Sequence, residues 1–193
     1  MTHLVLASGS PRRADLLRRL GVEFMVVRPD VDESVRPGEE PAVYVERLAR
    51  QKAAVVASPD VVTLGADTVV VHAGQLMGKP SHPAEATSML RRLSADTHQV
   101  FSAVATARQG DGGIVSESLV ETAMVRFLPL VEDEITAYVA TGEPLDKAGA
   151  YALQGRGGML VESIEGHPST VIGLPLVATR RLLARVGLDP LEP

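Results

Sequence analysis

The turn that begins at residue 8 has the side chains of a phosphate site. It reads SGSPRR, in which Ser8 and Ser10 supply hydroxyl groups. Arg12 and Arg13 supply charged groups that bind phosphate through paired hydrogen bonds. Ser10 is a preferred residue before a helix and Pro11 fits the first helical position, so free N–H groups of a helix start would also face an anion. The turn predicts phosphate binding; a capped helix with two solvated arginines is the alternative.

A carboxylate interrupts an apolar run at residue 67. Residues 61–66 read as a buried strand, which ends at Asp67, and residues 68–72 continue as strand. A buried carboxylate without a partner carries a large free-energy penalty, so Asp67 needs a metal, a basic side chain or a water that it activates. Ligands of open α/β sheets collect beyond strand ends. Asp67 is therefore the candidate catalytic residue; a structural aspartate in a turn is the alternative.

Two further segments carry residues suited to a nucleotide. The sequence GQLMGKP from residue 74 lacks the Walker spacing, so it is not a P-loop, but Lys79 offers a point charge for phosphate. The segment from residue 146 reads DKAGAYALQGRGG, whose glycines allow close approach of a ligand. Within it Lys147 is a second phosphate contact, and Gln154 has the donor and acceptor that reading a base edge requires. A solvated hairpin lysine and a flexible loop are the alternatives.

Two charged residues outside these segments are weaker candidates. Glu33 lies in an acidic loop over residues 29–41 and is a candidate metal ligand. Lys52 comes late in a predicted helix. Each side chain is more often a solvated surface charge. The histidines show no HExxH pairing for a metal, and the chain has no GxSxG elbow of a serine hydrolase.

The elements that must position these residues alternate between strand and helix. Strands are expected at residues 3–7, 22–27, 61–72, 99–108, 114–127 and 159–164. Helices are expected at residues 11–20, 41–57, 84–93, 132–141 and 175–186. A turn at Ala73-Gly74 leads into residues 75–76, and residues 109–113 join two long strands as a hairpin loop. The pattern predicts an α/β fold with a mixed sheet flanked by helices.

The composition is that of one globular domain, and we assign residues 1–193 to it. The net charge is −5 and aromatic residues make up 3%, which argues against a nucleic-acid partner. No stretch approaches the roughly 18 apolar residues of a membrane span, and the apolar run near the start is too short for a signal peptide. With no cysteine, thiolate metal sites and cysteine nucleophiles are excluded. We expect a soluble, cytoplasmic protein with a small-molecule ligand.

Several motifs together resemble one protein family. LASGSPRR, LGADTVV, GKP, GEPLDKAGAYALQGRGG and VIGLPL occur in the order found in the Maf-like nucleotide pyrophosphatases, from Leu6 to about Leu183. The resemblance implies an elongated mixed sheet in two lobes with a central cleft, similar to inosine triphosphate pyrophosphatases. It also implies a homodimer.

The same resemblance implies hydrolysis between the α- and β-phosphates with a divalent cation, Mg²⁺ or Mn²⁺. By this match Asp67 takes the general-base position and Glu33 is one of the positions around the metal and phosphates. Asp67 would orient the water either as general base or as metal ligand, and Glu33 is the second candidate for the metal. The positions around phosphates and substrate are taken by Ser8, Arg13, Lys52, Lys79 and Gln154.

At three residues the chain resembles the branch of the family that acts on dTTP and UTP. They are Arg12, Thr68 and Gln154, each of which usually differs in the branch acting on 7-methyl-GTP. The chain departs from the residues frequent in the family at two places, and both changes are conservative. Ala152-Leu153-Gln154 stands where Gly-Ile-Gln is frequent, and GKP stands where EKP is frequent.

The second function class is a regulator that binds a nucleotide and acts through a partner. The family resemblance implies septum formation and cell division as the process in which it would act. The chain keeps acid and base residues that a sensor would not need, which favours the enzyme. A kinase is excluded because the chain lacks a P-loop and kinase signatures.

Overall fold

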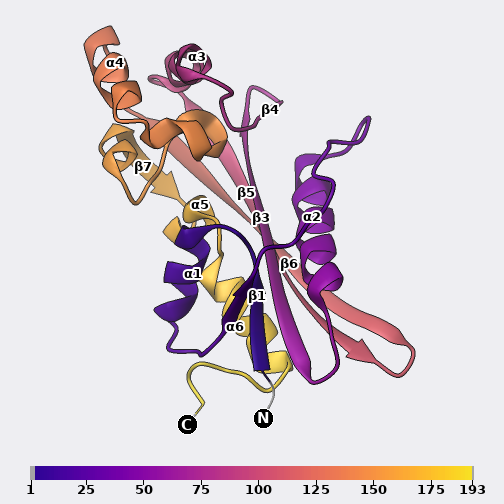
Figure 1. The fold of residues 1–193 in the computed structure, drawn as a ribbon. Coiled ribbons are helices and arrows are strands. Elements are labelled where there is room, and N and C mark those ends of the chain that lie inside the picture. Colours follow the sequence, from indigo (N-terminus) through magenta and orange to yellow (C-terminus); the bar gives the residue numbers. More distant parts are fainter. Residues whose placement is uncertain (1–2, 193) are drawn as a thin grey trace. The chain divides into compact units, whose positions relative to one another are not determined.

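The computed structural model describes residues 3–192 as a mixed α/β protein (Figure 1). Its strands are β1 His3–Ala7, β2 Met25–Val27, β3 Val61–His72, β4 Gln75–Met77, β5 Thr97–Gly110, β6 Gly113–Phe127 and β7 Val161–Glu165. Its α-helices are α1 Pro11–Arg18, α2 Pro41–Val56, α3 Pro83–Leu93, α4 Glu132–Ala140, α5 Pro168–Ile172 and α6 Leu176–Arg185. Short 3-10 helices are η1 Glu143–Asp146, η2 Ala148–Ala150 and η3 Arg156–Leu160.

The sheet is mixed, which confirms the predicted fold class. Strand order is β2-β1-β3-β5-β6-β7, with β4 paired to β3. Strand β1 runs parallel to β2 and β3, whereas β3 and β4, and likewise β6 and β7, are antiparallel. None of the helices within residues 3–192 has the length and apolar character needed to cross a bilayer.

The chain folds as two compact units, which share the three long strands β3, β5 and β6. Unit 1 comprises the chain up to Asp67, Ser102–Glu121 and the residues from Gly173 onward. Unit 2 comprises Thr68–Phe101 and Thr122–Ile172. The assignment of residues 1–193 to one domain, the central cleft and the likeness to inosine triphosphate pyrophosphatases stay predictions.

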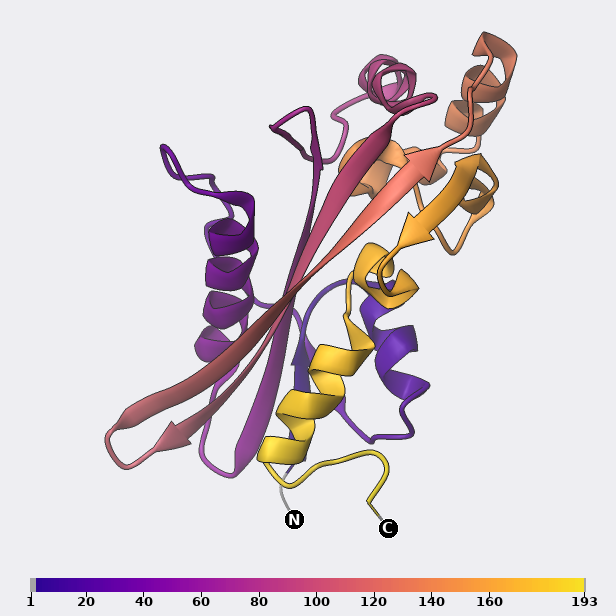
Figure 2. The ribbon, with the colours of Figure 1, turned by 180° about the vertical axis from the view of Figure 1, so that it is seen from behind.

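In unit 1, helices pack on both sides of β1 and β3. Figures 1 and 2 show α2 on one side and α1 and α6 on the other. Helix α2 begins with Pro41 and buries Val45, Leu48 and Ala49, whose spacing of three and four residues puts them on one helical face. Helix α1 buries Leu16 and Leu17 in the same way, whereas Leu20 lies beyond its last turn and is only partly buried.

Unit 2 has its own apolar core. Helix α3 lies next to α4 and contributes Leu90 and Leu93 to that core. Phe127 and Tyr151 meet His98 in mutual edge-to-face ring contacts, with centroids between 4.9 and 5.3 Å apart. Such contacts fix ring orientation more strictly than aliphatic packing does.

Besides the expected helix 11–20, which ends at Arg18, three expected elements differ from the structure. Strand 22–27 is limited to Met25–Val27, which is an edge strand with a neighbour on one side only, and all three of its residues are exposed. The expected strand 159–164 begins later, at Val161, because the glycine-rich residues before it form η3. The hairpin loop 109–113 is shorter than predicted, since β5 and β6 extend to Gly110 and from Gly113. Helix α5 and the 3-10 helices were not predicted.

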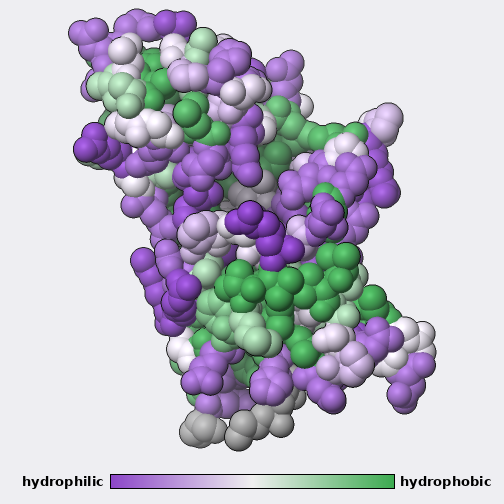
Figure 3. Space-filling model, in the orientation of Figure 1, coloured by the Kyte–Doolittle hydropathy of each residue, from purple (hydrophilic) through white to green (hydrophobic). Residues whose placement is uncertain are grey.

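Edge strand β2 carries an apolar surface of unit 1. Met25, Val26, Val27 and, on α2, Val55 are all exposed. Figure 3 shows an apolar area over β2 and the C-terminal part of α2. An exposed edge strand of this kind is a place where another chain can add.

A single glycine sets how closely α2 approaches the sheet. A Cβ at Gly65 would lie 2.6 Å from the backbone nitrogen of Ala53 and closer still to the carbonyl oxygen of Ala49. Both atoms belong to the backbone of α2 and cannot rotate away. Helix and strand therefore approach to a distance that no larger residue at position 65 permits.

We predict that Gly65→Ala destabilises the protein because α2 must move away from β3. The expected loss is about 1–3 kcal/mol of unfolding free energy, as for other overpacked cores. Urea denaturation followed by circular dichroism measures it. The matched control is Gly112→Ala, because a Cβ there meets nothing within 4 Å. Equal stability of the two variants would contradict the close approach.

Candidate active site

Parallel pairing brings the serine-arginine turn and Asp67 to the same level of the sheet. Ala7, the last residue of β1, is paired with Gly65 of β3. The chain turns away after Ala7, whereas β3 continues to His72, where it pairs with β4. Asp67 thus lies inside a strand rather than at its end, which corrects the sequence prediction. It nevertheless lies beyond the end of its neighbour β1.

The turn before α1 is organised by Ser8 rather than by Ser10. Ser10 occupies the position before the helix, but its side chain makes no capping hydrogen bond, contrary to the prediction. The Ser8 Oγ accepts hydrogen bonds from the backbone nitrogen of Ser10, at 3.2 Å, and from Nη1 of Arg13, at 3.3 Å. The Nε of Arg13 donates to the carbonyl oxygen of Gly173 at 2.8 Å. These bonds fix Arg13 beside the turn.

Lys52 lies between two carboxylates. Its Nζ is 2.6 Å from Oε1 of Glu33 and 2.7 Å from Oδ1 of Asp67. Lys52 and Asp67 are buried, with 6% and 7% of their surface exposed, whereas the Glu33 side chain is largely exposed. Buried charges of this kind are stable only when they are paired.

The local folding explains why Asp67 meets Lys52. Side chains alternate along a strand, so Asp67 points to the same face as Gly65, the face covered by α2. Lys52 lies one turn beyond Leu48 on that helix. The close approach at Gly65 therefore brings the lysine within hydrogen-bonding distance of the carboxylate.

The charges of unit 1 act on one another. Burial lowers the pKa of Arg13, while the charges of Asp67 and Glu33 raise it and that of Arg12 lowers it. Burial also raises the pKa of Tyr44 to about 12, with Asp67 and Glu33 acting in the same direction. The serine-arginine turn and the two carboxylates thus lie within electrostatic reach of one another.

The two carboxylates fit a divalent cation. Within residues 3–192 no group of three or more side chains is arranged to hold a metal without other ligands. Mg²⁺, however, is usually bound by one or two carboxylates together with substrate phosphates and water. Glu33 and Asp67, which share the ammonium group of Lys52, are hard oxygen donors of that kind. The metal and its ligands stay a prediction.

The remaining predicted residues lie in unit 2. The backbone nitrogen of Gly149 donates to the carbonyl oxygen of Gly78 at 3.1 Å, which places the GKP turn beside the glycine-rich segment. Lys79 and Gln154 are exposed at these two places. Lys147 is partly buried; its Nζ donates to the carbonyl oxygen of Glu143 and pairs with Asp146. Thr68 follows Asp67 in β3 and so points to the opposite face.

One carboxylate shapes the glycine-rich segment, and sequence analysis missed it. Glu143 accepts hydrogen bonds from the backbone nitrogens of Arg156 and Gly157, each at 3.0 Å, and from the hydroxyl of Tyr138 at 2.8 Å. A Cβ at Gly157 would lie 2.5 Å from that hydroxyl. The only signal in the sequence is that Glu143 belongs to the GEPLD motif. The role of Glu143 follows only from the folded structure, in which the glycine-rich segment packs against its carboxylate.

The structure therefore assembles part of the predicted set. In unit 1 it brings together Ser8 with Arg13, and Lys52 with Glu33 and Asp67. In unit 2 it joins the segments that carry Lys79 and Gln154. The roles assigned to all of these residues stay predictions.

Known proteins match this chain over most of its length. A sequence model described as "Maf-like protein" matches residues 3–186. The chain belongs to the Maf-like protein family. This confirms the resemblance drawn from its motifs.

Three curated relatives of this Maf-like protein carry the same name. A protein of Moorella thermoacetica named "dTTP/UTP pyrophosphatase" is 51% identical over 193 residues, with 98% of this chain and 97% of that protein covered. One of Myxococcus xanthus with the same name is 50% identical, with 97% and 94% covered. One of Symbiobacterium thermophilum, also so named, is 49% identical, with 97% and 95% covered.

We predict that Lys52→Met destabilises this Maf-like protein because it leaves Asp67 buried without its partner. Removal of one member of a buried ion pair costs about 3 kcal/mol. Adding Asp67→Asn to Lys52→Met removes the unpaired charge and should recover much of that loss. Urea denaturation of both variants measures the effect. If Lys52→Met alone were as stable as the unchanged protein, the Lys52–Asp67 ion pair would not contribute to folding stability.

Proposed function

We propose that the chain hydrolyses dTTP and UTP to the monophosphate and pyrophosphate. The observation that carries the proposal is the buried Asp67 carboxylate, held by Lys52 and within electrostatic reach of Arg13. A base beside fixed positive charge is what attack of water on a phosphoanhydride requires. The names of relatives that are 49% to 51% identical over nearly the full chain support the choice of substrates.

The reaction needs no covalent enzyme intermediate. Asp67 takes a proton from water as the water oxygen bonds to the α-phosphorus, and the bond from that phosphorus to the bridging oxygen breaks. Lys52 holds Asp67 in position through the 2.7 Å contact. Arg12 and Arg13 of the serine-arginine turn offset the negative charge that collects on the departing pyrophosphate.

A divalent cation, Mg²⁺ or Mn²⁺, completes the proposal. Glu33 and Asp67 would hold it, and it would neutralise charge on the phosphates. A carboxylate that ligates a metal is a poor base, so with Asp67 as the base the cation would be held chiefly by Glu33.

The remaining contacts determine which nucleotide is cleaved. We assign Ser8, Ser10, Lys79 and Lys147 to the phosphates, and Arg12, Thr68 and Gln154 to the choice of pyrimidine. The amide of Gln154 offers both a donor and an acceptor to the edge of a uracil or thymine ring. A site built on such paired bonds rejects bases that leave them unmade.

The cellular setting and assembly stay predictions. A cytoplasmic location is consistent with nucleoside triphosphates as substrates, and it is proposed on that ground. The homodimer implied by family resemblance is tested by sedimentation of the purified chain.

We predict that Asp67→Asn removes the base and leaves the fold and nucleotide binding in place. The expected fall in kcat is about 10²- to 10⁴-fold, the usual contribution of a general base. Steady-state kinetics with dTTP gives kcat, and calorimetric titration gives the affinity. The exposed Asp15→Asn on α1 is the control. A near-normal kcat for Asp67→Asn would remove Asp67 from the mechanism.

We predict that dTTP and UTP are cleaved well above ATP, GTP and 7-methyl-GTP, because only the pyrimidine edges pair with the site. Chromatography of the products distinguishes UMP with pyrophosphate from UDP with phosphate. Equal rates across the nucleotides would exclude the specificity. Nucleotide binding without release of pyrophosphate would instead favour the regulator that acts through a partner in cell division.

A further inference from the structure

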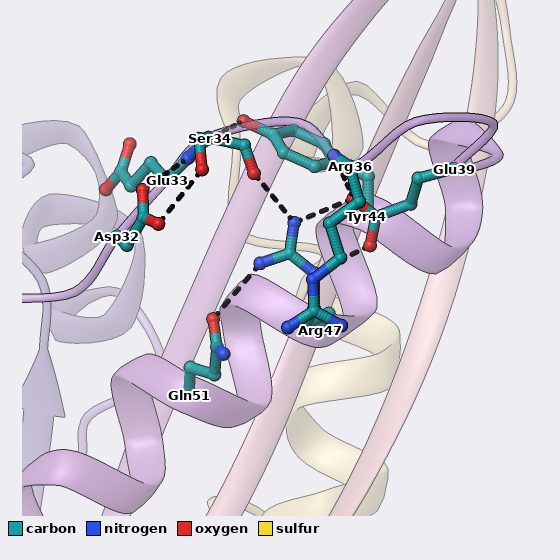
Figure 4. Close-up of polar contacts among 8 residues, drawn as sticks. All are labelled: Asp32, Glu33, Ser34, Arg36, Glu39, Tyr44, Arg47 and Gln51. Atoms are coloured by element: carbon teal, nitrogen blue, oxygen red, sulfur yellow. Dashed lines mark hydrogen bonds and ion pairs between the residues drawn. The ribbon is translucent and has the colours of Figure 1, made fainter.

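The loop before α2 carries Glu33 and is held on that helix by a single arginine. Arg47 approaches Glu39 with two nitrogens, Nε at 2.6 Å from Oε1 and Nη2 at 2.7 Å from Oε2 (Figure 4). The same Nη2 donates to the carbonyl oxygen of Ser34 at 3.1 Å, and Nη1 donates to Gln51 at 3.2 Å. Paired bonds between a guanidinium and a carboxylate fix direction as well as distance. Arg47 therefore holds the loop against α2 at two places, at Ser34 in its middle and at Glu39 near its end.

Tyr44 holds Glu33 itself. Its hydroxyl donates to the carbonyl oxygen of Glu33 at 2.9 Å, and its ring lies under the guanidinium of Arg47, 5.5 Å from centroid to Cζ. On the other flank, Asp32 accepts bonds from the backbone nitrogen and the hydroxyl of Ser34, both at 2.9 Å. Figure 4 shows these residues gathered along the loop and the facing side of α2. The backbone around Glu33 is thus bonded on either side.

One helix holds Glu33 at two points. Tyr44 bonds its carbonyl oxygen, and Lys52, eight residues further along α2, bonds its carboxylate. Arg47 lies between them on the same side of the helix, three residues from Tyr44. Because the Glu33 side chain is exposed, packing alone does not fix its direction. The helix supplies the constraint that packing does not.

We infer that Arg47 and Tyr44 are positioning residues that hold Glu33 beside Lys52 in the candidate active site. Their role in catalysis rests on the function proposed above. Neither side chain is assigned to substrate or metal. They act through the loop, because every bond described for them ends on the loop or on α2.

The fastening is intact at neutral pH. Hydrogen bonds from Arg47 lower the pKa of Glu39 to about 2, so the ion pair is lost only as the pH falls well below the usual carboxylate range. Burial keeps the hydroxyl of Tyr44 protonated by raising its pKa to about 12. The Arg47–Glu39 ion pair and the Tyr44 hydrogen bond therefore stay intact across a pH profile measured near neutrality.

Hydrogen exchange of the free protein tests whether Arg47 holds the loop. We expect Arg47→Gln to speed exchange of residues 30–40 by about tenfold, because the bonds lost are charge-assisted. Tyr44→Phe keeps the ring and removes one bond, so it should speed exchange by about threefold. No nucleotide or metal is needed for this measurement. Unchanged exchange in Arg47→Gln would overturn the inference.

The matched control is Arg50→Gln on the same helix. Arg50 also pairs with a glutamate, Glu46, and donates to a backbone carbonyl, that of Ser116, but it makes no bond to the loop. Its replacement should leave exchange of residues 30–40 at the level of the unchanged protein. Equal acceleration in both variants would show a general loss of stability and would overturn the role of Arg47.

Kinetics tests the consequence for catalysis. We expect kcat for dTTP to fall about tenfold in Arg47→Gln and to be kept in Arg50→Gln, since misplacing a catalytic group by about 1 Å has effects of this order or larger. Faster loop exchange with an unchanged kcat would overturn the positioning role. If the unchanged protein cleaved no nucleotide, the proposed function would be refuted. Hydrogen exchange of residues 30–40 would still decide whether Arg47 holds the loop.

Discussion

A buried charge must have a partner, and around Asp67 this requirement determines the structure of unit 1. The carboxylate is on the inner face of β3, where water cannot stabilise it, and Lys52 of α2 supplies the opposite charge at 2.7 Å. Lys52 in turn attracts Glu33 from the loop before the helix. Three segments that are separate in sequence are therefore joined at one ammonium group. The two carboxylates and the ammonium group thus stay close together within unit 1.

The distance between α2 and β3 makes this pairing possible. A lysine side chain has a fixed reach, and a helix held further from the sheet would leave its ammonium group short of the carboxylate. Gly65 permits the approach because its missing Cβ leaves room for the helix backbone at Ala49 and Ala53. A residue with no side chain thus contributes to the site through the space that it leaves. Packing and electrostatics at this point depend on each other.

Local patterns were sufficient to predict most elements, the mixed sheet and many site candidates. Helix α2 and strand β3 have clear periodicity, and SGSPRR carries its own helix-start signal. What sequence did not reveal is the pairing of side chains across segments. Ser10 has the better cap signal, yet Ser8 makes the bonds, because Arg13 reaches back to it. Glu143 and Arg47 bind backbone atoms, and a backbone partner leaves no signature in the letters of the sequence.

The alternation of side chains along β3 separates two tasks that are adjacent in the chain. Asp67 points toward α2, and Thr68, the next residue, points to the other face. An exchange at position 68 thus leaves the surroundings of Lys52 intact. Under the role proposed for Thr68, a substitution there that altered the choice of nucleobase would leave the ion pair between Asp67 and Lys52 in place.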